Sequence, residues 1–229
     1  MKPAIRKLSD MTNVVLNKEW IKTVKDRNLY YMFRARYKND SDLKRAKCKD
    51  LRYDITEIPA GRLGKEFTKT KGHYHSKVPG TDLTYPEVYQ VLEGKASYIL
   101  QKSDGKEIKD IIIINAKKGD IVIIPPGYGH VTSNPGDRVL RMANWVSTRF
   151  DSLYGDYETK HGGAYFQLDS GGWIYNQNYS KLPIPKIIQP PDFKVLFAVD
   201  DMYELIEDLN VLDFLNNPQD HPEMFRFSK

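Results

Sequence analysis

Short apolar segments, each closed by a turn that contains glycine or proline, dominate the middle of the chain. Between residues 66 and 146 the pattern predicts strands at 66–75, 87–93, 96–101, 110–115, 120–124 and 138–146. Turn-forming residues separate them, as in Ser103-Asp104-Gly105 and Asn134-Pro135-Gly136. Many short antiparallel strands of this kind are typical of a β-sandwich or a β-barrel. The sequence therefore predicts a mainly β fold.

The flanking segments add further elements. Alternating apolar residues predict strands at 29–37 and 52–58, and 192–198 resembles one more strand. From 200 to 216, apolar residues recur at helical spacing, which predicts one amphipathic C-terminal helix. We therefore expect three parts: an N-terminal extension that packs on the barrel (1–50), the barrel itself (51–180), and a C-terminal strand and helix extension (181–229).

The composition limits the class of protein. At 229 residues the chain is long enough for one barrel with additional elements. The formal net charge is +5, and the basic cluster at 38–52 is interpreted as a solvated surface instead of a nucleic-acid site. No apolar run reaches membrane-spanning length, and the single cysteine, Cys48, fits a reducing compartment. A cytoplasmic protein without a membrane or nucleic-acid partner is therefore expected.

Four side chains in two segments framed by glycine and proline form a candidate metal site. His73 and His75 are two positions apart, so on a strand they point to the same face. Glu87 opens an apolar strand, and His130 follows the corner Pro125-Pro126-Gly127 at the expected end of another strand. Three imidazoles and one carboxylate, with no thiolate, suit one divalent ion. Fe(II) is the expected metal, and Mn(II), Ni(II), Co(II) and Zn(II) are the alternatives.

These two segments resemble the two sequence motifs of the cupin superfamily. The second motif is represented by Gly119, Pro125, Gly127, His130 and Asn134. The first is represented by His73, His75, Glu87 and Gly94. The interval 76–86 is longer than usual for that motif and is interpreted as a loop inserted beside the metal. The resemblance implies a double-stranded β-helix, which is a jelly-roll barrel with a metal in its mouth.

A narrower resemblance, to the cupin-type or archaeal-type glucose-6-phosphate isomerases, extends from Arg6 to Tyr154. It is carried most specifically by Thr70-Lys71-Gly72-His73-Tyr74-His75 together with Pro86-Glu87-Val88-Tyr89. It implies an enzyme of glycolysis and gluconeogenesis that interconverts glucose 6-phosphate and fructose 6-phosphate. It also implies that the substrate phosphate binds to Thr56, Thr70, the backbone amide of Gly72, and Tyr154.

Moving a hydrogen between two sugar carbons requires a group that accepts it and a group that stabilises charge. The resemblance permits two mechanisms: proton transfer through an enediol with Glu87 as the base, or a metal-assisted hydride shift. Tyr89 follows Glu87 by two positions, on the same strand face, where it would orient sugar hydroxyls or relay a proton. The histidine that the family carries before the tyrosine-glycine pair is absent at 151–153. The nearest substitute for ring opening is His161.

Other functions stay open at this point: a cupin dioxygenase, a mannose-6-phosphate isomerase, or a non-catalytic sensor of sugar phosphates. A dioxygenase has no use for phosphate donors converging at Thr56, Thr70 and Gly72. A sensor gains support if the basic 38–52 segment contacts DNA, and loses support if the purified protein turns over substrate. Exposed barrel edges and the C-terminal helix predict a homodimer.

Overall fold

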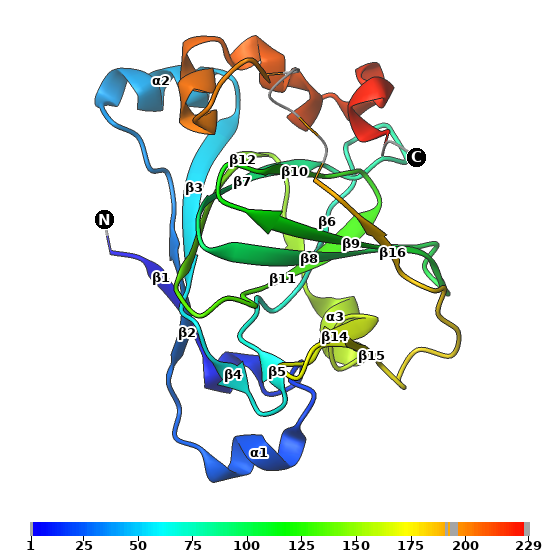
Figure 1. Ribbon diagram of the computed structural model, residues 1–229. Helices are drawn as coiled ribbons and strands as arrows, with labels where there is room; N and C mark the ends of the chain where they lie inside the picture. Colours follow the sequence, from blue (N-terminus) through cyan, green and yellow to red (C-terminus); the bar gives the residue numbers. More distant parts are fainter. Residues whose placement is uncertain (1, 191, 193–196, 227–229) are drawn as a thin grey trace.

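Two β-sheets face each other and enclose the main core (Figure 1). The computed structural model describes residues 2–190, 192 and 197–226. The larger sheet has the strand order β1 (Ala4–Lys7), β2 (Asn28–Phe33), β3 (Leu51–Ile58), β12 (Leu140–Ser147), β7 (Glu87–Glu93) and β10 (Ile121–Ile124). The smaller sheet has the order β11 (Tyr128–Ser133), β8 (Lys95–Ser103), β9 (Ile108–Lys117) and β16 (Lys186–Ile188).

Short elements surround the two sheets. Three further strand pairs are β4 (Arg62–Leu63) with β5 (Glu66–Phe67), β6 (Tyr74–His75) with β13 (Ser152–Leu153), and β14 (Tyr165–Gln167) with β15 (Trp173–Tyr175). The α-helices whose ends both lie within the described residues are α1 (Lys18–Thr23), α2 (Asp40–Cys48) and α3 (Gly155–Thr159). The 3-10 helices are η1 (Leu8–Met11), η2 (Met202–Glu207), η3 (Leu209–Leu215), η4 (Pro218–Asp220) and η5 (Pro222–Phe225).

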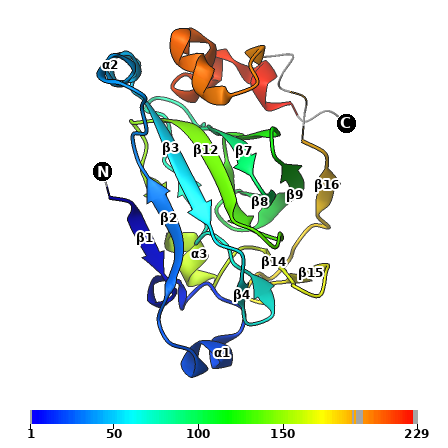
Figure 2. The ribbon, with the colours of Figure 1, turned by 60° about the vertical axis from the view of Figure 1, so that its left-hand side comes forward.

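Alternation along the central strands divides the larger sheet into two differently used faces. On β7, Tyr89 and Val91 point into the barrel, where they pack with apolar residues of the opposite sheet such as Tyr98 and Leu100. Val88 belongs instead to a second cluster on the outer face. That outer face is covered by α2 and the C-terminal 3-10 helices, which lie together at one end of the barrel (Figures 1 and 2). Because these helices cover only the outer face of the larger sheet, its inner face can line a cavity.

The described elements confirm the predicted mainly β fold, with two facing sheets built from antiparallel strands and one parallel pair. The strand predicted at 87–93 coincides with β7. Each end of five further predicted strands lies within two residues of the observed end: 52–58 is β3, 96–101 is β8, 110–115 is β9, 120–124 is β10 and 138–146 is β12. The strand predicted at 29–37 is the shorter β2. Among the described residues, no helix combines the length and apolarity needed to cross a membrane.

Two predicted elements are wrong in form. The segment 66–75 is not one strand: Gly72 has a φ of +84°, and between β5 and β6 only isolated bridges at Lys69 and His73 pair with β11 residues. The segment 200–216 is not one α-helix, because Asp208 has non-helical backbone angles, φ −138° and ψ 87°. Asp208 ends one 3-10 helix and is the N-cap of the next. The segment forms η2 and η3 instead. The strand predicted at 192–198 lies mainly outside the described residues.

The three-part division of the chain stays a prediction. Two observations bear on how its first part is built. β1 and β2 hydrogen-bond into the larger sheet, with β2 pairing antiparallel to β3. Helix α2 was not predicted, although Asn39 caps it by accepting a hydrogen bond from the backbone N–H of Asp42. The basic residues of 38–52 had suggested only a surface segment.

Candidate metal centre and substrate cavity

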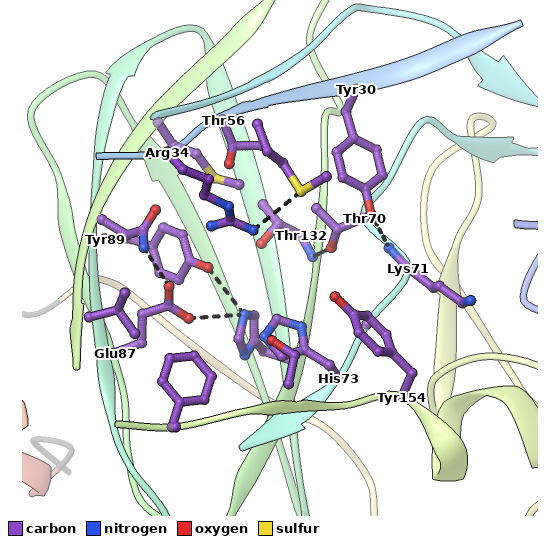
Figure 3. Close-up of a pocket in the computed structure, with 18 of the residues that line it drawn as sticks. Tyr30, Arg34, Thr56, Thr70, Lys71, His73, Glu87, Tyr89, Thr132 and Tyr154 are labelled. Atoms are coloured by element: carbon purple, nitrogen blue, oxygen red, sulfur yellow. Dashed lines mark hydrogen bonds and ion pairs between the residues drawn. The ribbon is translucent and has the colours of Figure 1, made fainter. Parts of the chain in front are cut away.

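A polar cavity lies on the inner face of the larger sheet. Figure 3 shows side chains from β3, β7 and the segment before β6 pointing into it, and Asn144 of β12 also lines it. Its position follows from strand register: Tyr89 of β7 pairs with Asn144 of β12, and Asn144 pairs with Asp54 of β3. Residues in register share a face, so these three side chains form one polar row across the sheet. Arg34 continues the row beyond the end of β2.

The four predicted metal ligands converge in this cavity. One donor atom from each of His73, His75, Glu87 and His130 lies within 4.8 Å of the others. The Nε2 atoms of His73 and His75 are 3.2 Å apart, and Glu87 Oε2 is 3.4 Å from His75 Nε2 and 3.6 Å from His130 Nε2. An isolated antiparallel bridge between His73 and His130 holds their two segments together. His130 lies inside β11, not at a strand end as predicted.

Hydrogen bonds behind the ligands orient their lone pairs toward the centre. His75 Nδ1 is 2.7 Å from the backbone oxygen of Tyr85, so it carries the proton and leaves Nε2 free to bind a metal. The Asn144 side-chain amide donates to Glu87 Oε1 at 2.7 Å. Glu87 Oε2 is buried and has no hydrogen-bond partner among the described residues. A buried carboxylate oxygen facing three imidazoles is the donor set that a divalent cation would satisfy.

Burial and neighbouring charges together set the protonation states of this group. It lowers the pKa of His130 to about 4 even though the nearby charge of Glu87 opposes the shift. Burial also lowers the pKa of His73, with contributions from the neighbouring imidazoles and from Arg34 and Arg6. For Glu87, burial alone would raise the pKa, but the neighbouring His75 and His130 lower it overall. At neutral pH the site therefore offers an ionised Glu87 carboxylate and the neutral imidazoles of His73 and His130.

The residues expected at the substrate phosphate line the same cavity. Thr56, Thr70, Gly72 and Tyr154 are all among its lining residues. Thr70 Oγ1 accepts a hydrogen bond from the backbone N–H of Thr132 at 2.9 Å, which fixes its hydroxyl at the cavity wall. A Cβ on Gly72 would lie 2.6 Å from ring atoms of Tyr157, so only glycine fits there. The Tyr154 ring lies 5.5 Å from the His73 ring.

Cationic groups that the sequence had not singled out surround this end of the cavity. The Arg6 guanidinium carbon lies 5.5 Å, and Lys71 Nζ lies 5.4 Å, from the centre of the Tyr154 ring. Lys71 also pairs with Glu158 of α3 at 2.5 Å. The Tyr30 hydroxyl accepts a hydrogen bond from the Lys71 backbone N–H at 3.3 Å. Only the pairing of β1 and β2 onto the barrel brings Arg6 and Tyr30 here, so no local pattern could have identified them.

The other two predicted catalytic residues have different surroundings. Tyr89 lines the cavity, with its hydroxyl 3.3 Å from His130 Nε2. Burial, reinforced by the charge of Glu87, raises the pKa of Tyr89 well above its usual value, so the hydroxyl keeps its proton. His161 is exposed in the turn after α3, with a φ of +56°, and is not among the lining residues. The structure therefore does not bring His161 to the other site residues.

Known proteins resemble this chain over most of its length. Residues 5–184 match the family described as glucose-6-phosphate isomerase (GPI). The glucose-6-phosphate isomerase of Thermococcus litoralis is 34% identical over 140 residues, which is 60% of this chain and 65% of that protein. The enzyme of the same name from Pyrococcus abyssi is 35% identical over 139 residues, 59% of this chain and 65% of that protein. The chain thus spans just under two thirds of these relatives.

More distant similarity extends to solved structures. The oxalate decarboxylase OxdC of Bacillus subtilis has a TM-score of 0.37 and 20% identity, covering 54% of this chain and 27% of that one. A cupin-like protein of Thermotoga maritima has a TM-score of 0.33 and 18% identity, covering 55% and 76%. The family assignment depends on neither structure, because the sequence match alone extends over residues 5–184. The chain belongs to the glucose-6-phosphate isomerase family.

Proposed function

We propose that this protein is a metal-dependent aldose–ketose isomerase that interconverts glucose 6-phosphate and fructose 6-phosphate in glycolysis and gluconeogenesis. One observation carries the proposal. The four-donor cluster of His73, His75, Glu87 and His130 opens into the same cavity as the hydroxyls and backbone amide expected to bind a phosphate. A phosphorylated sugar needs both features at once, and the glucose-6-phosphate isomerase names of the relatives agree with this substrate.

The proposed cofactor is one divalent metal ion held by His73, His75, Glu87 and His130. Fe(II) is the first candidate, and Mn(II), Ni(II), Co(II) and Zn(II) are the others. When bound, the ion supplies a Lewis acid that polarises the sugar carbonyl. The buried and otherwise unpartnered Glu87 Oε2 supports this assignment, because a carboxylate oxygen is costly to bury without a partner.

The phosphate is proposed to bind at the end of the cavity formed by Thr56, Thr70, Gly72 and Tyr154. Several neutral donors that converge on one anion hold it well, and the absent side chain of Gly72 allows the backbone to approach closely. Arg6 and Lys71 stand beside Tyr154 and add positive charge to this end. The charge attracts an anionic substrate and favours one orientation of it.

Hydrogen transfer is proposed to take place next to Glu87 and Tyr89. In the enediol path, Glu87 takes a proton from one sugar carbon and returns it to the next. In the hydride path, Glu87 acts only as a ligand. Tyr89 keeps its proton at neutral pH and would donate a hydrogen bond to a sugar oxygen in either case. Incorporation of solvent deuterium into the product would identify the proton path.

We also propose a cytoplasmic homodimer. The single cysteine suits a reducing compartment. β1 is an edge strand of the larger sheet, and its Ile5 is 43% exposed, which leaves an apolar side chain at this edge available to a second subunit. Sedimentation analysis at several protein concentrations measures the mass directly, and a monomer at all concentrations would refute the dimer.

A coupled assay tests the isomerase function. Fructose 6-phosphate is supplied, and the glucose 6-phosphate formed is oxidised by an added dehydrogenase, whose reaction is monitored. We expect turnover in the metal-loaded protein, loss after treatment with a chelator, and recovery when one of the five candidate metals is restored. Mannose 6-phosphate serves as the competing substrate. If no metal supports turnover of fructose 6-phosphate, the proposed function is wrong.

A further inference from the structure

Arg34 occupies a position in the cavity that neither the metal centre nor the phosphate end explains. It follows β2 and lies at the end of the polar row formed by Asp54, Asn144 and Tyr89. In Figure 3 its guanidinium lies on the side of the cavity that holds Tyr89 and Glu87, away from Tyr154 and Lys71. The charge of Arg34 thus lies toward the metal centre.

Asp54 holds this guanidinium in place. Asp54 is fully buried, and its Oδ2 accepts a hydrogen bond from Arg34 Nη1 at 2.6 Å. The same carboxylate also accepts hydrogen bonds from Arg52 Nε and from the backbone N–H of Ala35, each at 2.9 Å. Asp54 therefore already has two other donors, one of them cationic. Arg34 is not needed merely to neutralise it.

The rest of the Arg34 guanidinium is available to a ligand. Its only other hydrogen bond within the described part of the chain is a long one, 3.4 Å, from Nη2 to the sulfur of Met32. A guanidinium has five N–H donors, so most of them remain unused. The side chain is 43% exposed and lines the cavity, so a bound ligand can reach it.

We propose that Arg34 is a catalytic residue that donates a hydrogen bond to the sugar oxygen that becomes negatively charged near the metal centre. This inference rests on the isomerase function proposed above. Both hydrogen-transfer paths move the electrons of the carbonyl bond onto oxygen, so a preorganised cation beside that oxygen lowers the barrier in either path. Asp54 supplies the preorganisation, because it fixes the guanidinium before the substrate arrives.

Binding to the metal-free protein provides a readout that is independent of turnover. Two probes are compared by calorimetry after chelator treatment: arabinonate 5-phosphate, with a carboxylate at the reacting end, and arabinitol 5-phosphate, with a neutral hydroxyl there. Arg34→Met should weaken binding of the aldonate by about tenfold to a hundredfold, as expected for a lost charge-assisted hydrogen bond. Binding of the alditol should change by less than about threefold. An equal loss for both probes, or no loss, would overturn the inference.

Kinetics of the metal-loaded protein separate a catalytic role from a structural one. Arg34→Met should lower kcat by about tenfold or more while KM for fructose 6-phosphate changes little, because the contact strengthens in the transition state. Arg34→Lys should recover part of kcat, since it keeps the charge but loses the planar fork. Arg36→Met, which replaces an exposed arginine two positions further on and outside the cavity lining, is the matched control.

The two proposals fail in different ways. If the wild-type protein shows no turnover with any metal, the isomerase function is wrong, while the contrast between the two probes still reports on Arg34. If the wild type turns over and Arg34→Met retains its kcat, the inference about Arg34 is wrong and the isomerase function stands. Circular dichroism of each variant shows whether it is folded, and Arg34→Lys provides the test if Arg34→Met is not.

Discussion

At the scale of single residues, the groups behind the four proposed metal ligands matter as much as the ligands themselves. The Asn144 amide donates a hydrogen bond to Glu87 Oε1, and His75 Nδ1 donates one to the backbone oxygen of Tyr85. What remains facing the centre is the other oxygen and the other nitrogen. The cluster is thus prepared for a cation before one arrives, since outer hydrogen bonds fix the ring tautomer and orientation.

His130→Ala should remove metal and activity together. The substitution takes away one of four donors, and even loss of an outer hydrogen bond costs about tenfold to a hundredfold in metal affinity. Metal content after dialysis, measured by elemental analysis, and the coupled assay report the two losses. His161→Ala is the control, because His161 is exposed and outside the cavity lining. A His130→Ala protein that keeps a full complement of metal would contradict the ligand assignment.

Alternation, residue chemistry and the glycine and proline frame predicted from the sequence that His73, His75, Glu87 and His130 come together, as they do here. These four lie in short segments whose strand or turn character is local information. Arg34 and Tyr30 were missed for a physical reason: they reach the cavity only because β2 pairs with β3, a contact between distant parts of the chain. Asp54 was missed because its partners, Arg34 and Arg52, look like ordinary charged residues of a strand.

At the scale of elements, sequence periodicity predicted the ends of a strand well where the strand pairs with a neighbouring strand on both sides. β7 lies between β12 and β10 and was predicted to the residue. The prediction failed at 66–75, where the chain pairs only intermittently with β11 and turns at Gly72. It also failed at 200–216, because apolar spacing alone does not distinguish one α-helix from two 3-10 helices separated at Asp208.

Tyr203 joins two elements, η2 and α2, through its hydroxyl. It donates to Asp42 at 2.6 Å and accepts from the Lys38 backbone N–H at 2.7 Å. Burial, reinforced by Asp42, raises the pKa of Tyr203 to about 12. In the unfolded chain a tyrosine loses its proton near pH 10. Between these two pH values the unfolded state binds fewer protons than the folded one, so the contribution of Tyr203 is complete below pH 10 and is lost as the pH rises toward 12.

Tyr203→Phe should therefore destabilise the protein by about 1–3 kcal/mol at pH 8, as expected for loss of buried hydrogen bonds. The difference in the free energy of unfolding between wild type and variant should shrink at pH 11. Urea titrations at both pH values measure it. Tyr175→Phe, at a tyrosine that is 55% exposed, controls for general alkaline effects. A difference that stays constant from pH 8 to pH 11 would disprove the assigned role.

At the scale of the whole molecule, the larger sheet separates two cores with different tasks. The inner core surrounds the cavity, and the outer core joins the sheet to α2 and the C-terminal 3-10 helices. Trp145 of β12 joins the sheet to the C-terminal helices within the outer core: its indole N–H donates to the backbone oxygen of Met202 at 2.9 Å. Residues 202–225 lie beyond the family match at 5–184, yet they cover an apolar face that would otherwise contact water.

Phe214→Ala should destabilise the whole protein without altering the metal centre. Phe214 is 1% exposed, and truncating a buried phenylalanine costs about 3–5 kcal/mol. Val211→Ala is the matched control, because Val211 belongs to the same helix η3 but is 40% exposed. Thermal unfolding measures both, and metal content is expected to be normal in the folded fraction. Equal effects of the two substitutions would refute the proposed covering role.

The hydrogen bond between His75 and the main-chain oxygen of Tyr85 determines which kinds of mutation in the 76–86 loop would disturb the site. Every amino acid supplies that oxygen, so replacing side chains one at a time would pass over it unnoticed. The number of residues in the loop matters instead, because one residue added or removed between His75 and Pro86 would shift the carbonyl that orients the imidazole. The exposed positions of this loop, such as Pro79 and Asp82, should therefore tolerate substitution, whereas the loop should not tolerate a change in length.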